Sequence, residues 1–237
     1  MAVAATGFFD GVHSGHRTVV GKMLSIAAAK NEESLVVTFW PHPKTVLSQC
    51  SSDFRLLTTL QEKLDIFASC GVDRVEVLPF SRDFSLLPAR EFVKEYLAER
   101  FGVTTLVVGY DHRLGHDSFE TVERMMDVIS SCGIEPVKVE RIDGESGTVS
   151  SSAIRKALLA GDVDAAAGML GYRYSVQGTL KASGGCFEFV PERSKLLPAD
   201  GDYEVKMDGK DAYCKIKDGI VSVFLLSLPS VNTKLIF

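Results

Sequence analysis

The chain has 237 residues, of which 46% are hydrophobic and 24% charged, and 26 basic against 31 acidic residues give a formal net charge of −5. These values are typical of globular proteins and exclude the disordered, collagen-like and low-complexity classes. The mildly acidic balance gives no sign of a general nucleic-acid-binding or anionic-membrane-binding surface. The longest apolar runs, such as 35–39 and 220–226, are far shorter than the roughly 20 residues of a membrane-spanning helix. Because residues 1–7 lack the basic region of a signal peptide, we expect a cytoplasmic protein.

The first part of the chain, up to residue 170, alternates short apolar runs with longer amphipathic segments. The predicted strands are Val3–Ala5, Leu35–Phe39, Val75–Leu78, Thr105–Val108 and Pro136–Val139. The predicted helices are Arg17–Lys30, a helix from the capping box Thr59–Glu62 to near Gly71, Ala89–Phe101, Phe119–Ser131, Ser151–Ala160 and Val163–Leu170. This alternation predicts an α/β fold, a parallel sheet with helices on both faces. Ligands of such folds bind at the carboxyl ends of the strands, near a switch in strand order.

After Gly171 the pattern changes to a period of two, with glycine-containing turns between the apolar runs. Tyr203–Met207, Ala212–Ile216 and Ile220–Leu225 are predicted strands of an antiparallel meander. We therefore expect two domains, 1–171 and 172–237. The 66 residues of the second domain can form a small β-domain with little core to spare.

The cysteines do not show the spacing of a functional site. They are five in number and scattered, with no C-x-x-C pair: Cys50, Cys70, Cys132, Cys186 and Cys214. An odd, dispersed set argues against both a disulfide framework and a structural zinc site, so we expect free or buried thiols and no resident metal.

The strongest motif is Thr6–His16 (TGFFDGVHSGH), which lies between a predicted strand and a predicted helix. Its glycines allow a tight turn and a close approach of the backbone to a ligand, and the helix start offers free N–H groups to an anion. His13 and His16 can both face that anion and donate hydrogen bonds to a phosphate that gains charge in the transition state. The alternative is an N-capping turn with two surface histidines. The combination of features in one segment favours the anion site.

The second motif is Thr148–Arg155 (TVSSSAIR), which opens a helix. Serines at a helix N-terminus are often only caps. Here Ser151 and Ser152, the exposed helix N–H groups and Arg155 one turn further on would make a clamp for a triphosphate. This chemistry complements that of the first motif and favours the functional interpretation.

Two weaker motifs also follow apolar strands. Val107–His116 (VVGYDHRLGH) contains a strand-end Gly-x-Asp, which alone is a common turn. Thr38–Pro43 (TFWPHP) places Trp40 next to a rigid Pro-His-Pro segment that could form a wall for an aromatic ligand. The same residues could equally form a stiff loop with Trp40 in the core.

Four segments, in this order and spacing, resemble the family of bacterial bifunctional riboflavin kinase/FMN adenylyltransferases, the prokaryotic FAD synthetases: GFFDGVHSGH, WPHP, GYDHRLGH and VSSSAIRKALLAGDVDAAAGMLG. The resemblance covers Ala5 to about Gly178. The first segment holds the HxGH signature of nucleotidyltransferases, and the others narrow the resemblance to the flavin branch. It implies a Rossmann-like nucleotidyltransferase fold and transfer of AMP from Mg²⁺-bound ATP to FMN, which gives FAD and pyrophosphate. No enzyme nucleophile is needed, because the FMN phosphate attacks the α-phosphorus in line.

The resemblance also implies roles for individual residues. The implied catalytic residues are His13, His16 and Arg155. The implied ATP-binding residues are Gly7, Phe8, Phe9, Asp10, Gly15, His16, Gly109, Asp111, Ser151, Ser152 and Arg155. The implied flavin-binding residues are Pro41, His42, Pro43, Asp111 and His112. The implied partners are the small molecules ATP and FMN, with no nucleic acid and no membrane.

The kinase half of the family is matched poorly. Leu170–Gly178 resembles the link into the first strand of the kinase barrel, but the Pro-Thr-Ala-Asn signature is missing and the comparable stretch is Gly185–Pro191 (GCFEFVP). The remaining 66 residues are about half of the usual barrel, and the family's C-terminal helices are absent before Phe237. We therefore expect no riboflavin kinase activity. The tail is expected to pack on the first domain or to mediate self-association, which leaves a homo-oligomer open.

Two further departures keep other functions open. His116–Phe119 (HDSF) replaces an Arg-x-Gly pattern, and the segment usually found before the first strand is nearly absent. Either difference could alter flavin affinity or indicate a nucleotidyltransferase with another phosphorylated acceptor. A third hypothesis is a non-catalytic module that binds flavin or nucleotide, although the retained histidines and Arg155 count against it.

Overall fold

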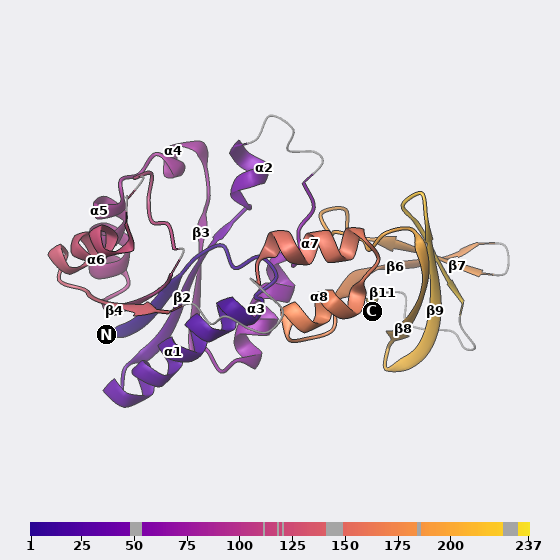
Figure 1. The fold of residues 1–237 in the computed structure, drawn as a ribbon, viewed down its shortest axis with the longest axis horizontal. Helices are drawn as coiled ribbons and strands as arrows, with labels where there is room; N and C mark the ends of the chain where they lie inside the picture. The colour runs from indigo at the N-terminus through magenta and orange to yellow at the C-terminus, as the bar shows by residue number, and fades with distance from the viewer. Residues whose placement is uncertain are drawn as a thin grey trace. The chain divides into compact units, whose positions relative to one another are not determined.

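Figure 1 shows a computed structural model of the chain, which describes residues 1–47, 54–110, 112–117, 119, 121–140, 149–183, 186–224 and 232–237. The chain divides into two compact units. The first unit is Met1–Phe54 with Leu60–Glu145, and the second unit is Arg55–Thr59 with Ser146–Phe237. Each unit is described by itself.

The first unit is built on a parallel sheet of five strands in the order β3-β2-β1-β4-β5. The strands are β1 (Ala2–Thr6), β2 (Glu33–Trp40), β3 (Arg74–Pro79), β4 (Val103–Gly109) and β5 (Glu135–Val139). Each lies where the sequence predicts a strand, so the predicted parallel α/β sheet is confirmed. The strand order switches at β1, which has β2 on one side and β4 on the other. The carboxyl ends of β1 and β4 are therefore where this fold class binds ligands.

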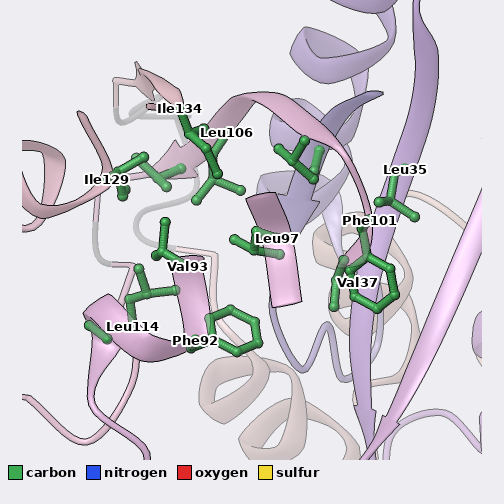
Figure 2. Close-up of a cluster of buried hydrophobic side chains, with 14 of the residues drawn as sticks. Leu35, Val37, Phe92, Val93, Leu97, Phe101, Leu106, Leu114, Ile129 and Ile134 are labelled. Atoms are coloured by element: carbon green, nitrogen blue, oxygen red, sulfur yellow. The ribbon is translucent and has the colours of Figure 1, made fainter. Parts of the chain in front are cut away.

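Helices bury both faces of this sheet. They are α1 (Ser14–Lys30), α2 (Pro43–Leu47), α3 (Leu60–Ser69), α4 (Arg82–Ser85), α5 (Ala89–Glu91), the π-helix η2 (Phe92–Arg100) and α6 (Val122–Ser131). Alternate strand residues enter two separate clusters: Leu35 and Val37 of β2 pack with Leu97 of η2, whereas Val36 packs with residues of α1 and α3. Figure 2 shows the first of these clusters. Because both faces are covered, the central strands are apolar at successive positions, as in buried parallel sheets.

The second unit holds two helices and a closed antiparallel barrel in the order β10-β7-β6-β11-β8-β9. Its elements are α7 (Ser151–Leu159), α8 (Val163–Leu170), β6 (Ser175–Ser183), β7 (Cys186–Pro191), β8 (Gly201–Met207), β9 (Lys210–Lys217), β10 (Ile220–Phe224) and β11 (Asn232–Ile236). The predicted meander corresponds to β8, β9 and β10. The sequence did not predict β6, β7 and β11, which close the barrel.

Helices α7 and α8 belong with the barrel rather than with the parallel sheet. They lie side by side (Figure 1), and Ile154, Leu158 and Leu170 are fully buried in one cluster with Leu57 and barrel residues such as Val176. The compact unit that contains the barrel thus begins before the boundary expected near Gly171. The physical reason is that the apolar faces of both helices are buried against the barrel.

Within the ranges that the structure describes, no helix has the length and apolar character needed to cross a membrane. Cys70, Cys132 and Cys214 are free thiols. Burial in the barrel raises the pKa of Cys214 to about 12, so this thiol stays protonated and unreactive. Cys50 lies outside the described residues.

Candidate functional site

The loop between β1 and α1, Gly7–His13, turns sharply at the switch point of the sheet. Its first amide donates to the carbonyl of Val37 on the neighbouring strand at 3.1 Å. Phe9 and Val12 have φ of 49° and 36°, in the left-handed region that residues other than glycine rarely adopt. Such strained positions persist only where the surroundings hold them, and they cluster at functional sites. We call this segment the β1–α1 loop.

The two histidines of the motif form a stacked pair at the N-terminus of α1. His13 is the N-cap residue, and its Nδ1 accepts from the backbone N–H of His16 at 3.4 Å. The two rings are nearly parallel, with centroids 3.6 Å apart. His13 is only 7% exposed. The capping alternative is therefore correct for His13, but it is not a surface histidine.

The glycines of the motif leave room for the rings. A Cβ at Gly15 would lie 3.3 Å from the His13 ring, and one at Gly7 would lie 3.2 Å from the ring of Phe9. The edge of Phe9 in turn meets His16 at a centroid distance of 5.2 Å. The HxGH spacing thus admits the stacked pair because Gly15 has no side chain to crowd the His13 ring.

His16 is held in its neutral form. Burial lowers its pKa well below the ordinary value, and the neighbouring charges of His13, Lys63 and His112 lower it further. Among the described residues, its buried Nδ1 has no hydrogen-bond partner. Since an unpaired buried N–H is rarer than an unpaired acceptor, the proton of the neutral ring belongs on Nε2. The acceptor role of His13 Nδ1 sets the same tautomer there.

Lys63 of α3 is a charged residue of this site that the sequence analysis missed. It is 3% exposed, and its Nζ donates to the carbonyl oxygen of Phe8 at 2.6 Å and to Thr38 Oγ1 at 3.4 Å. The same ammonium lies 6.0 Å from the centroid of the Trp40 ring. Burial lowers the pKa of Lys63 to about 8, against the opposing influence of the Asp10 carboxylate. A positive charge is therefore buried directly beneath the backbone of the β1–α1 loop.

A signal for Lys63 is present in the sequence. Leu60, Lys63 and Phe67 follow the three-and-four spacing of one helix face, and Phe67 is fully buried. A lysine on the apolar face of a helix is unusual, because lysine is almost never fully buried unless paired.

The Pro-His-Pro segment joins an aromatic cluster next to the loop. His42 stacks on Phe54 at a centroid distance of 4.8 Å, and Phe8 lies 5.6 Å from His42 and 5.0 Å from Phe39. The Trp40–Pro41 bond is cis, Pro43 begins α2, and the His42 carbonyl accepts from the amide of Thr45 at 2.9 Å. Trp40 is partly exposed, so it is not simple core. The segment is thus a turn that belongs to an aromatic cluster, and its role as a wall for an aromatic ligand stays a prediction.

The end of β4 brings further predicted residues to the switch point. Gly109 is the last residue of β4, and its carbonyl accepts from the His112 amide at 3.2 Å. The charge of His112 is one of the influences that lower the pKa of His16. Asp111 lies outside the described residues. Across the described ranges, no group of three or more His, Cys, Asp or Glu side chains could hold a metal ion.

The segment His116–Phe119, which departs from the family pattern, contains residues that bind the backbone at the start of α5. Asp117 Oδ2 accepts from the Ala89 amide at 2.5 Å, and the His116 amide donates to the Leu87 carbonyl at 2.8 Å. Gly115 has φ of 66°, and a Cβ there would lie 2.3 Å from the Ala89 nitrogen. The described part of this segment thus has a clear structural role.

The serine-rich motif opens α7 in the second unit. Ser150 is the N-cap residue, and its Oγ accepts from the amide three residues later at 3.2 Å. Arg155 donates from Nη1 to the Ser151 carbonyl and from Nη2 to the Arg55 carbonyl, both at 3.2 Å. Ser152 is exposed. The helix therefore has an ordinary cap, and its arginine is held by two backbone carbonyl groups.

Comparison with known proteins identifies the family. Residues 1–153 match the model of the family described as FAD synthetase. The chain belongs to this family. The bifunctional riboflavin kinase/FMN adenylyltransferase of Listeria monocytogenes is 36% identical over 180 residues, which are 75% of this chain and 56% of that protein. The protein of the same name from Bacillus subtilis is 33% identical over 218 residues, 87% of this chain and 67% of that protein.

The chain thus spans between about half and two thirds of the length of these curated FAD synthetase relatives. Among solved structures, the crystal structure described as a macrolide-efflux protein from Streptococcus pneumoniae has a TM-score of 0.87 and 25% identity, and the match covers 100% of this chain and 83% of that one. That likeness supports the fold of both units.

Proposed function

We propose that the chain is an FMN adenylyltransferase, which transfers AMP from ATP to FMN and releases FAD and pyrophosphate. Membership of the FAD synthetase family and the names of the relatives support this proposal. The observation that carries it is the stacked His13–His16 pair at the N-terminus of α1, on a strained loop at the switch point of a parallel sheet. A helix N-terminus there offers backbone N–H groups and a positive dipole end to phosphate oxygens.

The reaction needs positioning and charge stabilisation rather than a nucleophile from the protein. An oxygen of the FMN phosphate attacks the α-phosphorus of ATP, and the bond from that phosphorus to the β-bridging oxygen breaks as pyrophosphate leaves. The Nε2–H groups of His13 and His16 donate to oxygens that gain charge in the transition state. Magnesium enters with ATP as part of the substrate. In this proposal Gly7, Phe8, Phe9, Asp10, Gly15 and Gly109 line the nucleotide.

The flavin ring is assigned to the aromatic cluster beside the loop. The stacked rings of His42 and Phe54 and the neighbouring Phe8 present flat, apolar surfaces of the kind that pack against an isoalloxazine ring. In this proposal Pro41, Pro43 and His112 flank the flavin ring. Asp111, implied by the resemblance for both substrates, stays a prediction.

The N-terminus of α7 is proposed as a second phosphate-binding element. Ser151, Ser152 and Arg155 occupy the place of the family's serine-rich motif, and the Arg155 guanidinium is fixed by two carbonyl groups, which lowers the entropy lost when it binds an anion. We further propose that the chain does not phosphorylate riboflavin. This rests on residues 185–191, which replace the family's Pro-Thr-Ala-Asn signature.

A single assay with two acceptors tests both proposals. The purified protein is incubated with Mg·ATP and either FMN or riboflavin, and the flavin product is identified by chromatography. We expect FAD from FMN and no FMN or FAD from riboflavin. His16→Gln should lose FAD formation, whereas Lys22→Gln, at an exposed residue of the same helix outside the motif, should keep it. A folded wild-type protein that makes no FAD would refute the adenylyltransferase.

The altered segment at His116–Phe119 favours one other candidate, a nucleotidyltransferase with a different phosphorylated acceptor. Pyrophosphate release from ATP, screened over several phosphorylated small molecules, separates the two candidates. Release with FMN as the best acceptor supports the main proposal, and release with another acceptor alone supports the alternative.

A further inference from the structure

Among the described residues of the first unit, Lys63 is the most deeply buried charge that the proposed chemistry does not yet use. It is 3% exposed, and the described contacts of its ammonium are one short bond to the Phe8 carbonyl, a longer one to Thr38 and the face of Trp40. Burying an ammonium group is unfavourable unless charge and hydrogen bonds compensate. A methionine or leucine at this position of α3 would bury more easily. The benefit of a lysine at this position must therefore lie in the groups that its ammonium contacts.

The carbonyl that Lys63 binds belongs to the strained part of the molecule. Phe8 directly precedes Phe9, whose φ is 49°, and Val12 of the same loop has φ of 36°. A charge-assisted hydrogen bond of 2.6 Å fixes the peptide group between Phe8 and Phe9. Fixing the carbonyl on one side of this peptide also fixes its N–H on the other side. Lys63 is thus placed to hold the loop in the conformation that precedes the N-terminus of α1.

Lys63 also supplies charge to the histidine pair. Its positive charge is one of the influences that keep His16 neutral, after burial and His13. The buried Asp10 carboxylate of the same loop raises the pKa of Lys63 and so opposes the effect of burial. The ammonium therefore binds the backbone of the loop and acts electrostatically on His16, while the loop's only acidic side chain acts on the ammonium.

We propose that Lys63 is a positioning residue of the adenylyl-transfer site, which holds the β1–α1 loop through the Phe8 carbonyl and places a buried positive charge beside His16. The hydrogen bond aligns the loop for the phosphate groups of the nucleotide. The charge keeps His16 in the neutral, hydrogen-bonding form and adds to the positive field that binds polyphosphate. This inference rests on the proposed function for its catalytic part, whereas its effect on nucleotide binding and on His16 is measured without any acceptor.

Three variants separate the hydrogen bond from the charge. Lys63→Met removes both and fills a similar volume, Lys63→Gln keeps a hydrogen-bond donor without charge, and Lys63→Arg keeps donor and charge. Lys195→Met is the matched control, because Lys195 is also buried, also donates to a backbone carbonyl (that of Leu57) and also lies over an aromatic ring, in the second unit. Binding of Mg·ATP is followed by the fluorescence of Trp40, the single tryptophan of the chain. The ionisation of His16 is followed by NMR.

We expect Lys63→Met to weaken Mg·ATP binding or the maximal rate of FAD formation by about 10- to 100-fold, the effect of losing a charged hydrogen bond at a reaction site. The NMR titration of His16 should move towards that of an ordinary histidine, because a neighbouring positive charge is lost. Lys63→Arg should restore most of both properties, and Lys63→Gln should restore neither the titration nor full binding. Lys195→Met should leave the titration of His16 unchanged.

Two results would overturn the inference. One is a folded Lys63→Met protein with wild-type nucleotide binding and an unchanged His16 titration. The other is a Lys63→Arg protein as impaired as Lys63→Met in both measurements, which would show that Lys63 only fills space. If Lys63→Met does not fold, the comparison of Lys63→Gln with Lys63→Arg decides the same question. If the wild type makes no FAD but binds Mg·ATP, and the variants order as expected, the proposed function fails while the positioning role of Lys63 stands.

Discussion

The N-termini of α1 and α7 carry the two motifs that sequence analysis assigns to phosphate groups, yet they are built differently. At α7 a serine caps the helix in the usual way, and Arg155 is held by two backbone carbonyl groups. At α1 the cap is a buried histidine stacked on a second histidine, and the loop before it has positive φ at Phe9, Gly11 and Val12. A buried lysine supports that loop.

From this difference we propose that chemistry takes place at the α1 terminus and ground-state binding at the α7 terminus. Ordinary capping stabilises a helix by about 1 kcal/mol and needs no strain. The α1 terminus instead combines backbone strain with a histidine kept neutral and a buried ammonium, features that oppose stability and persist only for another benefit. We therefore expect changes at α1 to alter the rate of reaction most, and changes at α7 to alter stability and ground-state binding more.

The largest effect is expected for His16→Ala. Removal of one preorganised donor to the developing charge should cost about 2–4 kcal/mol of transition-state stabilisation. This loss corresponds to a fall in kcat of roughly 30- to 1,000-fold. Steady-state FAD formation with saturating ATP measures it. An unchanged kcat would contradict this expectation, because the α1 terminus would then be no more specialised than that of α7.

Arg155→Ala should have the next largest effect. Loss of a charged group that binds phosphate is expected to raise the KM for ATP by about 10- to 100-fold, equivalent to about 1.5–3 kcal/mol. The expected change in kcat is smaller than that for His16→Ala. A fall in kcat with an unchanged KM would show that Arg155 acts in the chemical step, as proposed for the histidines. It would contradict the proposed difference between the α1 and α7 termini.

The pH dependence of stability should follow His16. The pKa of His16 in the folded protein lies below its value in the unfolded chain, so the unfolded chain binds more protons between these two values. The free energy of unfolding therefore falls as the pH drops below about 6.5, by at most about 1.4 kcal/mol per pH unit. Above that pH this group adds no slope. Urea unfolding followed by Trp40 fluorescence should show the loss in the wild type and a smaller loss in His16→Gln. Equal slopes in the two proteins would contradict a neutral His16.

The smallest effect is expected for Ser150→Ala, which removes the side-chain cap of α7. The free energy of unfolding should fall by about 1 kcal/mol, the usual value of an N-cap. Thermal unfolding followed by circular dichroism measures it. A loss of several kcal/mol would show that α7, like α1, has a specialised terminus.

The sequence predicted the parallel sheet and the histidine pair because their signals are local. Leu35–Phe39 is apolar at every position except Thr38 since helices cover both of its faces, and the HxGH spacing lies within one turn. The closure of the barrel is not local: β11 pairs with β6, Leu235 opposite Val176, and no neighbouring residues encode that pairing. Likewise, the packing of α7 and α8 on the barrel depends on surfaces that come together only in the folded unit.

Lys63 and Asp117 were missed for a related reason. A lysine on a helix is usually solvated, and only the fold places Lys63 beneath the Phe8 carbonyl. Asp117 caps the start of α5 from a segment that follows it in the chain, so its carboxylate and the Ala89 amide are separated by the whole of η2 and β4. Interactions between residues distant in sequence are what the pattern of a single chain does not contain.

Adenylyl transfer at the α1 terminus is tested most directly by following the phosphorus atoms of ATP. The protein is incubated with FMN and Mg·ATP labelled at either the α- or the γ-phosphate, and the label is located in the products. We expect α-label in FAD and γ-label in pyrophosphate, with both transfers lost in His16→Ala. Incorporation of γ-label into the flavin, or no labelled FAD from a folded protein, would contradict it.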